Sequence, residues 1–255
     1  MTGEASTRQK DLYEAIHDVY EAHYYDDAAM AYRKRFYYQP LFDDLKLDGK
    51  SVADLACGSG HNSLILRQRF PSVELTGFDI SSHACRDYRR LVGRPAFECD
   101  LTKPMDVTPA FDAAMIFGGL HHCVSDLATT LQNVARMLKP GGVFLMLEPN
   151  KRCYLELLRR LWYALDRRYF DAQSEAALDH EQLAAGVAAT FRPELVKFMG
   201  GPGYFLIAQS LVLRVPLSWK HVMLPALLRC ESLYNRLPGY YPFAYFLARW
   251  RRTNA

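Results

Sequence analysis

The chain has 255 residues, of which 50% are hydrophobic, 13% aromatic and 23% charged. This composition is that of an ordinary globular protein and excludes disordered and fibrous chains. A net charge of only +3 argues against a dedicated nucleic-acid binder, whose affinity comes from neutralising many phosphates. The positive charge lies late in the chain, since residues 151–255 hold 15 Lys and Arg against 8 Asp and Glu. We expect any anionic ligand or membrane surface to contact this part of the chain.

The cysteines and the apolar stretches point to a cytoplasmic protein. Six cysteines are scattered without CxxC spacing or a Cys/His cluster, so we expect reduced thiols and no metal site. Residues 1–10 are polar, and the longest apolar stretch, Tyr204–Trp219, is broken by polar residues and a proline. We therefore expect neither a signal peptide nor a spanning helix.

The predicted elements begin with a helical N-terminal cap over residues 1–45, where apolar residues recur at helical spacing among Asp, Glu and Arg. Residues 46–150 alternate short apolar runs with helical segments. Strands are expected at Ser51–Ala56, Val73–Phe78, Ala96–Cys99, Ala113–Phe117 and Val143–Leu147, and helices at His61–Phe70, Ser82–Leu91 and Ser125–Leu138. This alternation predicts parallel βαβ units and an α/β sheet covered on both faces.

Residues 151–255 add helices and the last strands to the same sheet, so we expect one domain over residues 1–255. Helices are predicted at Tyr154–Tyr169, Glu175–Ala189, Tyr204–Leu213 and His221–Leu237, and strands at Glu194–Met199 and Phe243–Trp250. The segment Tyr154–Phe170 is aromatic and basic. We expect it to pack on its own domain, with peripheral membrane contact as the alternative.

A glycine turn follows the first predicted strand, in the run Asp54-Leu55-Ala56-Cys57-Gly58-Ser59-Gly60. Glycines there allow tight backbone angles and the close approach of a ligand to the start of the next helix. Asp79 ends the second strand and Asp100 follows the third, both at the edge where open α/β sheets bind ligands. Asp79 suits two ribose hydroxyls, and Asp100 with Leu101 suits an adenine ring. Capping of a helix explains either acid, taken alone, equally well.

The stretch from Ser51 to Pro149 resembles the class I S-adenosylmethionine-dependent methyltransferases. The resemblance rests on the glycine turn, Phe78-Asp79-Ile80, Cys99-Asp100-Leu101, Gly118-Gly119-Leu120-His121-His122 and Leu138-Lys139-Pro140-Gly141-Gly142. It implies a Rossmann-like, doubly wound seven-stranded sheet with the last strand antiparallel. It also implies S-adenosylmethionine as the cofactor, S-adenosylhomocysteine as the product, and a small hydrophobic or aromatic acceptor, with O- or N-methylation favoured.

Carried over by position, the resemblance assigns the cofactor contacts. These are Asp54, Ala56, Gly58, Gly60, Asp79, Ile80, Asp100, Leu101, Phe117 and Gly118. Ala56 stands where the family has its first glycine, a change that costs little only if the backbone there is ordinary. In the cap, we expect the carboxylate of the cofactor to be bound by Tyr24 and Tyr25 with Arg33 or Arg35.

His121 and His122 are the candidate general bases, because they follow the fourth strand at the ligand edge and an imidazole titrates near neutrality. Capping or packing is the alternative role for both. Two other functions stay open: a protein that binds S-adenosylmethionine without methyl transfer, and a nicotinamide-dependent oxidoreductase. The oxidoreductase fingerprint GxGxxG would need glycine where this chain has Ser63.

Overall fold

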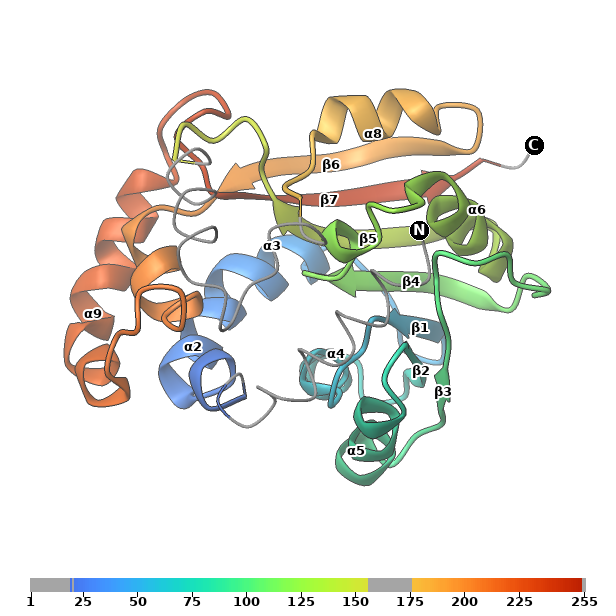
Figure 1. The fold of residues 1–255 in the computed structure, drawn as a ribbon, viewed down its shortest axis with the longest axis horizontal. Coiled ribbons are helices and arrows are strands. Elements are labelled where there is room, and N and C mark those ends of the chain that lie inside the picture. Colours follow the sequence, from blue (N-terminus) through green and yellow to red (C-terminus); the bar gives the residue numbers. More distant parts are fainter. Residues whose placement is uncertain (1–18, 20, 156–175, 254–255) are drawn as a thin grey trace.

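The computed structural model describes residues 19, 21–155 and 176–253. They form a seven-stranded sheet of order β3-β2-β1-β4-β5-β7-β6 (Figure 1). The strands are β1 Ser51–Leu55, β2 Glu74–Asp79, β3 Ala96–Glu98, β4 Phe111–Phe117, β5 Leu138–Pro149, β6 Phe191–Met199 and β7 Tyr245–Arg252. β1 to β5 pair in parallel, and β7 runs antiparallel between β5 and β6. The predicted doubly wound sheet with an antiparallel last strand is confirmed.

Helices cover both faces of the sheet and give each face its own core (Figure 1). Because side chains alternate along a strand, Val52 joins one core and Ala53 the other. The first core includes residues of α2 Asp27–Arg33, α3 Gln39–Phe42, α4 His61–Arg69, α5 Ser82–Val92 and α9 Leu217–Tyr234. The second includes residues of α6 Leu127–Met137 and α8 His180–Gly186. Three short helical turns complete the described elements: η1 Lys34–Tyr38, η2 Leu120–His122 and η3 Tyr204–Ala208.

Three predicted elements differ from the observed ones. The stretch Tyr204–Leu213 forms only the π-helical turn η3 followed by turns, although its apolar spacing predicts a longer helix. Helix α8 begins at His180, where Asp179 accepts hydrogen bonds from the backbone of Glu181 and Gln182. The Pro140-Gly141-Gly142 turn lies inside β5, where the pairing with β4 shifts register. Residues 156–175, which include most of the predicted Tyr154–Tyr169 helix, lie outside the described residues.

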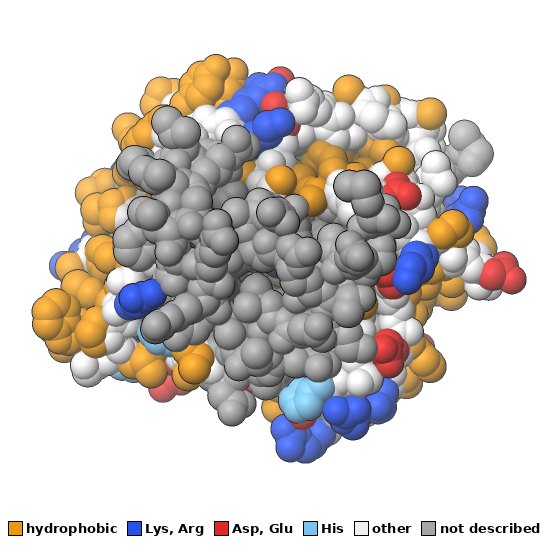
Figure 2. Space-filling view, in the orientation of Figure 1, with side chains coloured by type: hydrophobic (Ala, Val, Ile, Leu, Met, Phe, Trp, Pro, Cys, Tyr) orange, Lys and Arg blue, Asp and Glu red, His pale blue; other side chains and the backbone are white. Residues whose placement is uncertain are grey.

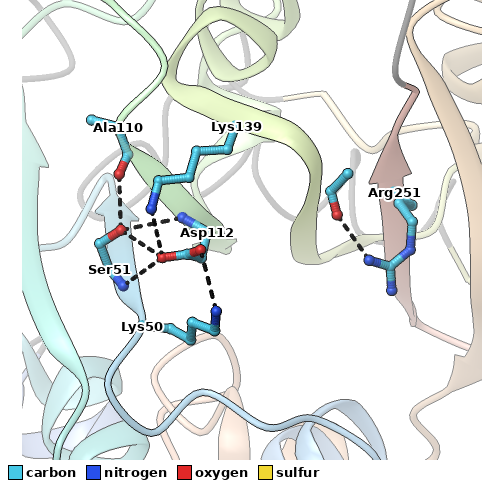
Figure 3. Close-up of polar contacts among 7 residues, drawn as sticks. Lys50, Ser51, Ala110, Asp112, Lys139 and Arg251 are labelled. Carbon is cyan, nitrogen blue, oxygen red and sulfur yellow. Dashed lines mark hydrogen bonds and ion pairs between the residues drawn. The ribbon is translucent and has the colours of Figure 1, made fainter.

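The amino-terminal edge of the sheet is tied together by Asp112 of β4 (Figure 3). Its carboxylate accepts hydrogen bonds from the Ser51 backbone at 3.0 Å, the Ser51 hydroxyl at 2.9 Å and Lys139 Nζ at 3.0 Å. Lys50 Nζ lies 3.7 Å from its other oxygen. At the far side of the same view, Arg251 donates to the carbonyl of Gly141 at 2.8 Å. These contacts join β1, β4 and β5 on the side opposite to the predicted ligand edge.

Two buried polar groups of α9 hold the N-terminal cap against the rest of the molecule. Glu231 accepts hydrogen bonds from the Tyr32 hydroxyl of α2 at 2.6 Å and from the backbone N–H groups of Gly201 and Gly203. Lys220 donates to the carboxylate of Asp26 at 2.7 Å, and its side chain is fully buried. The cap is therefore fixed to α9 and to the loop that follows β6.

Candidate functional site

The glycine turn follows β1 and leads into α4. Gly58 and Gly60 have φ values of 51° and 92°, in the left-handed region that glycine tolerates. A Cβ on Gly60 would lie 2.3 Å from Val92 and 2.7 Å from Tyr88, both of α5. Glycine at this position is therefore required by the close packing of the α4 start against α5, independently of any ligand.

Ala56 also has a left-handed backbone, with φ of 50°. Alanine at this position costs little only if the backbone angles are ordinary, and that condition is not met. A left-handed alanine costs about 1 kcal/mol relative to glycine. Across the turn, a Cβ on Gly119 would lie 2.6 Å from the Ala56 methyl group. The Ala56 methyl group therefore fits only because residue 119 is a glycine.

Asp54 lies under the turn and holds α4 to the sheet. Its carboxylate is 1% exposed and accepts a 2.7 Å hydrogen bond from Ser63 of α4, which in turn lies 2.8 Å from the Tyr88 hydroxyl of α5. Burial raises the pKa of Asp54 to about 8, although the Ser63 hydrogen bond opposes the shift. The nearby Asp79 carboxylate adds to the rise.

Asp79 closes β2 and faces the turn. One carboxylate oxygen accepts from the Gly58 backbone and the other from the Ser81 backbone, both at 2.9 Å. Each carboxylate oxygen can accept more than one hydrogen bond. Ile80 follows and is half-buried. The carboxylate is thus held rigidly beside Gly58, which fits a pair of ribose hydroxyls at this place.

Asp100 and Leu101 follow β3 at the same edge. Asp100 accepts from the backbone and hydroxyl of Thr102 at 3.0 and 2.6 Å, and Lys103 lies 3.2 Å from its second oxygen. Partial burial raises the pKa of Asp100, but these hydrogen bonds outweigh it and lower the pKa below its usual range. Asn133 donates to the carbonyls of Leu101 and Lys103 and so fixes the loop. The Leu101 side chain is 5% exposed, which leaves little of its surface for a ring.

A buried carboxylate that sequence reasoning missed organises the histidine stretch after β4. Glu148, near the end of β5, accepts from the backbone N–H groups of Gly119, Leu120 and His121 at 2.8 to 3.2 Å. Its Oε2 lies 2.7 Å from His121 Nδ1. Complete burial raises the pKa of Glu148 to about 8, and the three backbone donors oppose that shift. Because backbone donors approach both oxygens, Nδ1 of His121 is assigned as the donor and Nε2 as the acceptor.

The other residues around β4 lie close to this pair. The His122 ring stands 4.0 Å from the His121 ring, centroid to centroid. Gly118 has φ of 71° and donates to the carbonyl of Leu147. Phe117 contacts Tyr38 and Phe42 of the cap, with ring centroids 6.1 and 6.2 Å apart. The cap therefore reaches the end of β4.

The cap places Tyr25 over the start of α4 and directs Tyr24 elsewhere. The Tyr25 ring stacks on the His61 ring at 4.0 Å, and the Arg33 guanidinium lies 4.7 Å from the Tyr25 ring centroid. Tyr24 donates to Gln209 Oε1 at 2.7 Å, so its hydroxyl faces the loop after η3. Tyr25 and Arg33 are thus gathered beside the glycine turn. The contact of any cap residue with a cofactor stays a prediction.

The sequence is similar to known methyltransferases over this core. Residues 52–142 match a family model described as a methyltransferase domain. Over 104 residues the chain is 32% identical to trans-aconitate 2-methyltransferase of Azoarcus sp. (strain BH72), covering 40% of each protein. Over 94 residues it is 31% identical to the ubiquinone/menaquinone biosynthesis C-methyltransferase UbiE of Desulfotalea psychrophila, covering 36% of this chain and 38% of that protein. The match therefore spans less than half of these relatives.

Over residues 52–142 the chain is therefore similar to the class I S-adenosylmethionine-dependent methyltransferases. The fold agrees over nearly the whole length. The [4+2]-cyclase SpnF superposes with a TM-score of 0.64 at 16% identity, covering 98% of this chain and 97% of that one. Geranyl diphosphate C-methyltransferase of Streptomyces coelicolor, solved with S-adenosylhomocysteine, gives 0.57 at 17% identity, with 89% and 82% covered. These structures support the family fold beyond the matched core.

Proposed function

We propose that this methyltransferase-family protein binds S-adenosylmethionine at the carboxyl edge of β1, β2 and β4 and methylates a small hydrophobic or aromatic molecule. The observation that carries the proposal is the pairing of Asp79 with the glycine turn, at 2.9 Å from Gly58 N to the carboxylate. That carboxylate can accept from two vicinal hydroxyls, and the positive φ angles of Gly58 and Gly60 bring backbone rather than side chains to the ligand side. When bound, the cofactor supplies a methyl group activated on a sulfonium sulfur.

Deprotonation of the acceptor is the task we assign to His121. Its Nδ1 is held by Glu148, so Nε2 is the ring nitrogen that we assign to take a proton from a hydroxyl acceptor. Glu148 acts as a positioning residue, because its two oxygens fix both the imidazole and the backbone of residues 119–121. The names of the two relatives refer to small molecules, trans-aconitate and the quinones, which supports a small-molecule acceptor.

Calorimetry with S-adenosylmethionine and S-adenosylhomocysteine tests the binding site. Asp79→Asn keeps the size of the side chain but replaces one acceptor oxygen by a donor group. Loss of one or two charge-assisted hydrogen bonds costs about 2–4 kcal/mol, so affinity should fall roughly 30- to 1,000-fold. Asp87→Asn on α5, where the carboxylate pairs with His83 and Arg90 of the same helix, is the matched control and should bind normally. Equal affinity in Asp79→Asn and the wild type would reject the ribose assignment, and tight binding of NADH would favour the oxidoreductase alternative.

The methyl-transfer step is tested by incubating protein and cofactor with a panel of small hydrophobic and aromatic compounds and detecting the gain of one methyl group by mass. His121→Ala should lower kcat by about 10²–10⁴ for a hydroxyl acceptor, with cofactor affinity nearly unchanged. Glu148→Gln should lower kcat less and alter the pH profile, since the imidazole would lose its carboxylate partner. His83→Ala, at an exposed position on α5, is the control. Cofactor binding without any methylated product would instead support the binding-protein alternative.

A further inference from the structure

Helix α9 is apolar on two opposite faces, and only one of them is used inside the molecule. The inner face carries Leu224, Leu227 and Leu228, which pack against the core that contains α2 and η3. The outer face carries Trp219, Val222, Ala226 and Leu233, at spacings of three, four and seven residues, which places them on one side of a helix. All four are exposed, Val222 to 82% and Trp219 to 64%. An exposed apolar face of this length requires an explanation.

The exposed apolar side chains gather at this end of the molecule. Ten large hydrophobic side chains are exposed in the described part of the chain, and six of them fall within residues 213–241. They are Leu213, Trp219, Val222, Leu233, Leu237 and Tyr241. Figure 2 shows hydrophobic side chains at the left edge of the molecule, where Figure 1 places α9. We call this set of residues the α9 surface.

The exposed charges between residues 213 and 241 all have one sign. Arg214, Arg229 and Arg236 are exposed, whereas Glu231, the single acidic residue between 213 and 241, is buried against Tyr32 and the loop after β6. Lys220 is buried with Asp26 and adds nothing to the surface. A stretch of apolar side chains with exposed arginines and, within residues 213–241, no exposed carboxylate complements the acyl region and negative headgroups of an anionic bilayer. A protein partner of ordinary composition would not explain the absence of acids between 213 and 241.

We infer that the α9 surface docks the protein onto membranes that contain anionic lipids. The helix lies along the bilayer surface, with Trp219, Val222 and Leu233 in the headgroup region and the arginines on lipid phosphates. At 18 residues α9 is about 27 Å long. No helix among the described residues is long and apolar enough to cross a membrane. Gly200, directly after the end of β6, donates to Asn235 at the end of α9, so α9 lies at the carboxyl side of the sheet. Docking through α9 therefore brings the bilayer to that side. The inference is independent of the proposed methyl transfer.

Sedimentation with large unilamellar vesicles tests the inference without any assay of methyl transfer. The wild-type protein should pellet with phosphatidylcholine vesicles that contain about a third phosphatidylglycerol and much less with pure phosphatidylcholine. Val222→Glu should lower the partition coefficient at least tenfold, and Arg229→Gln should lower it about fivefold, the effect of one basic residue near an anionic surface. Leu91→Glu replaces a 41% exposed leucine on α5 and should bind as the wild type does.

Fluorescence of Trp219 gives a second measurement on the folded protein. In a Trp162→Phe background the emission comes from Trp219 and from Trp250, which is fully buried in the sheet core. Anionic vesicles should shift the emission to the blue, and bromine-labelled acyl chains should quench it. A wild-type protein that stays in the supernatant with anionic vesicles, or a Val222→Glu variant that binds like the wild type, overturns the inference. A dimer that Val222→Glu dissociates, in the absence of vesicle binding, would assign the surface to a second copy and also overturn it.

Discussion

The methyl group of Ala56 determines how the glycine turn packs against the loop after β4. Ala56 is held at φ of 50°, and its methyl group leaves no space for a side chain at Gly119, where a Cβ would lie 2.6 Å away. Ala56→Gly should raise the free energy of unfolding by about 0.5–1 kcal/mol, because strain is removed. Gly119→Ala should lower it by about 1–3 kcal/mol through overpacking. Urea denaturation of both single variants and the double variant measures the coupling.

The double variant tests whether the contact between residues 56 and 119 determines the packing of the turn. In the Ala56→Gly background the Gly119→Ala change should cost less, since the facing methyl group is gone and only the Ile116 side chain, at 2.9 Å, must move. Additive effects of the two changes would show that the contact does not determine the packing of the turn. Gly186→Ala on α8 is a control, because a Cβ there has nothing within 4 Å.

The buried carboxyl of Asp54 predicts a pH dependence of stability at the same scale. Burial raises its pKa from 3.8 to about 8, so the folded protein holds this proton more tightly than the unfolded chain. The stabilisation is complete below the unfolded value and is lost as the pH rises through about 8. Asp54→Asn does not ionise and can still accept from Ser63. Its unfolding free energy should therefore fall less than that of the wild type between about pH 5 and 9, while exposed Asp43→Asn should follow the wild-type curve.

At the scale of elements, the hydrogen bonds of Asp112 join β1, β4 and β5, and we expect their contribution to the free energy of unfolding to depend on pH. Partial burial raises the pKa of Asp112, but the hydrogen bonds from Ser51 and Lys139 prevail and lower it to about 2. The network therefore stabilises the fold above the usual carboxyl pKa and is lost as the pH falls toward about 2. Asp112→Ala should cost about 1–2 kcal/mol at neutral pH, after allowance for partial exposure, and nothing near pH 2. Thermal unfolding at both pH values checks this, with Asp106→Ala as the control.

The sequence predicts the elements of the core well because each strand ends at a glycine, acid or proline and each helix has its own apolar spacing. It also locates Asp79 beside the turn, since parallel strands end at one edge. It misses Glu148, whose role depends on residues 119–121 folding back onto β5, from which they are separated by 27 to 29 positions in the sequence. The available signal was that an acid, Glu148, directly follows the fifth apolar run, as Asp79 and Asp100 follow the second and third. Helical spacing also does not show which way the Tyr24 and Tyr25 side chains point. Only the packing of the cap directs Tyr24 to Gln209 and Tyr25 to His61.

At the scale of the whole molecule, Glu231 joins three parts of the chain that are distant in sequence. It accepts from Tyr32 of α2 at 2.6 Å and from the N–H groups of Gly201 and Gly203, both at 2.9 Å, inside the core. Glu231→Gln replaces one acceptor oxygen by an amide group that faces existing donors. It should lower the free energy of unfolding by about 1–3 kcal/mol, the cost of buried donors left unpaired. Chemical denaturation followed by circular dichroism measures the loss.

The location of that loss distinguishes a tether of the cap from a general core defect. Tyr32 is the contact on the cap side, so Tyr32→Phe combined with Glu231→Gln should cost less than the sum of the single changes. The cap covers the glycine turn through Tyr25 on His61 and Tyr38 on Asn62. Limited proteolysis of Glu231→Gln should therefore cut first within residues 21–50, with the sheet intact. Cleavage spread evenly over the chain, or equal destabilisation by the exposed control Glu74→Gln, would show that Glu231 does not tether the cap.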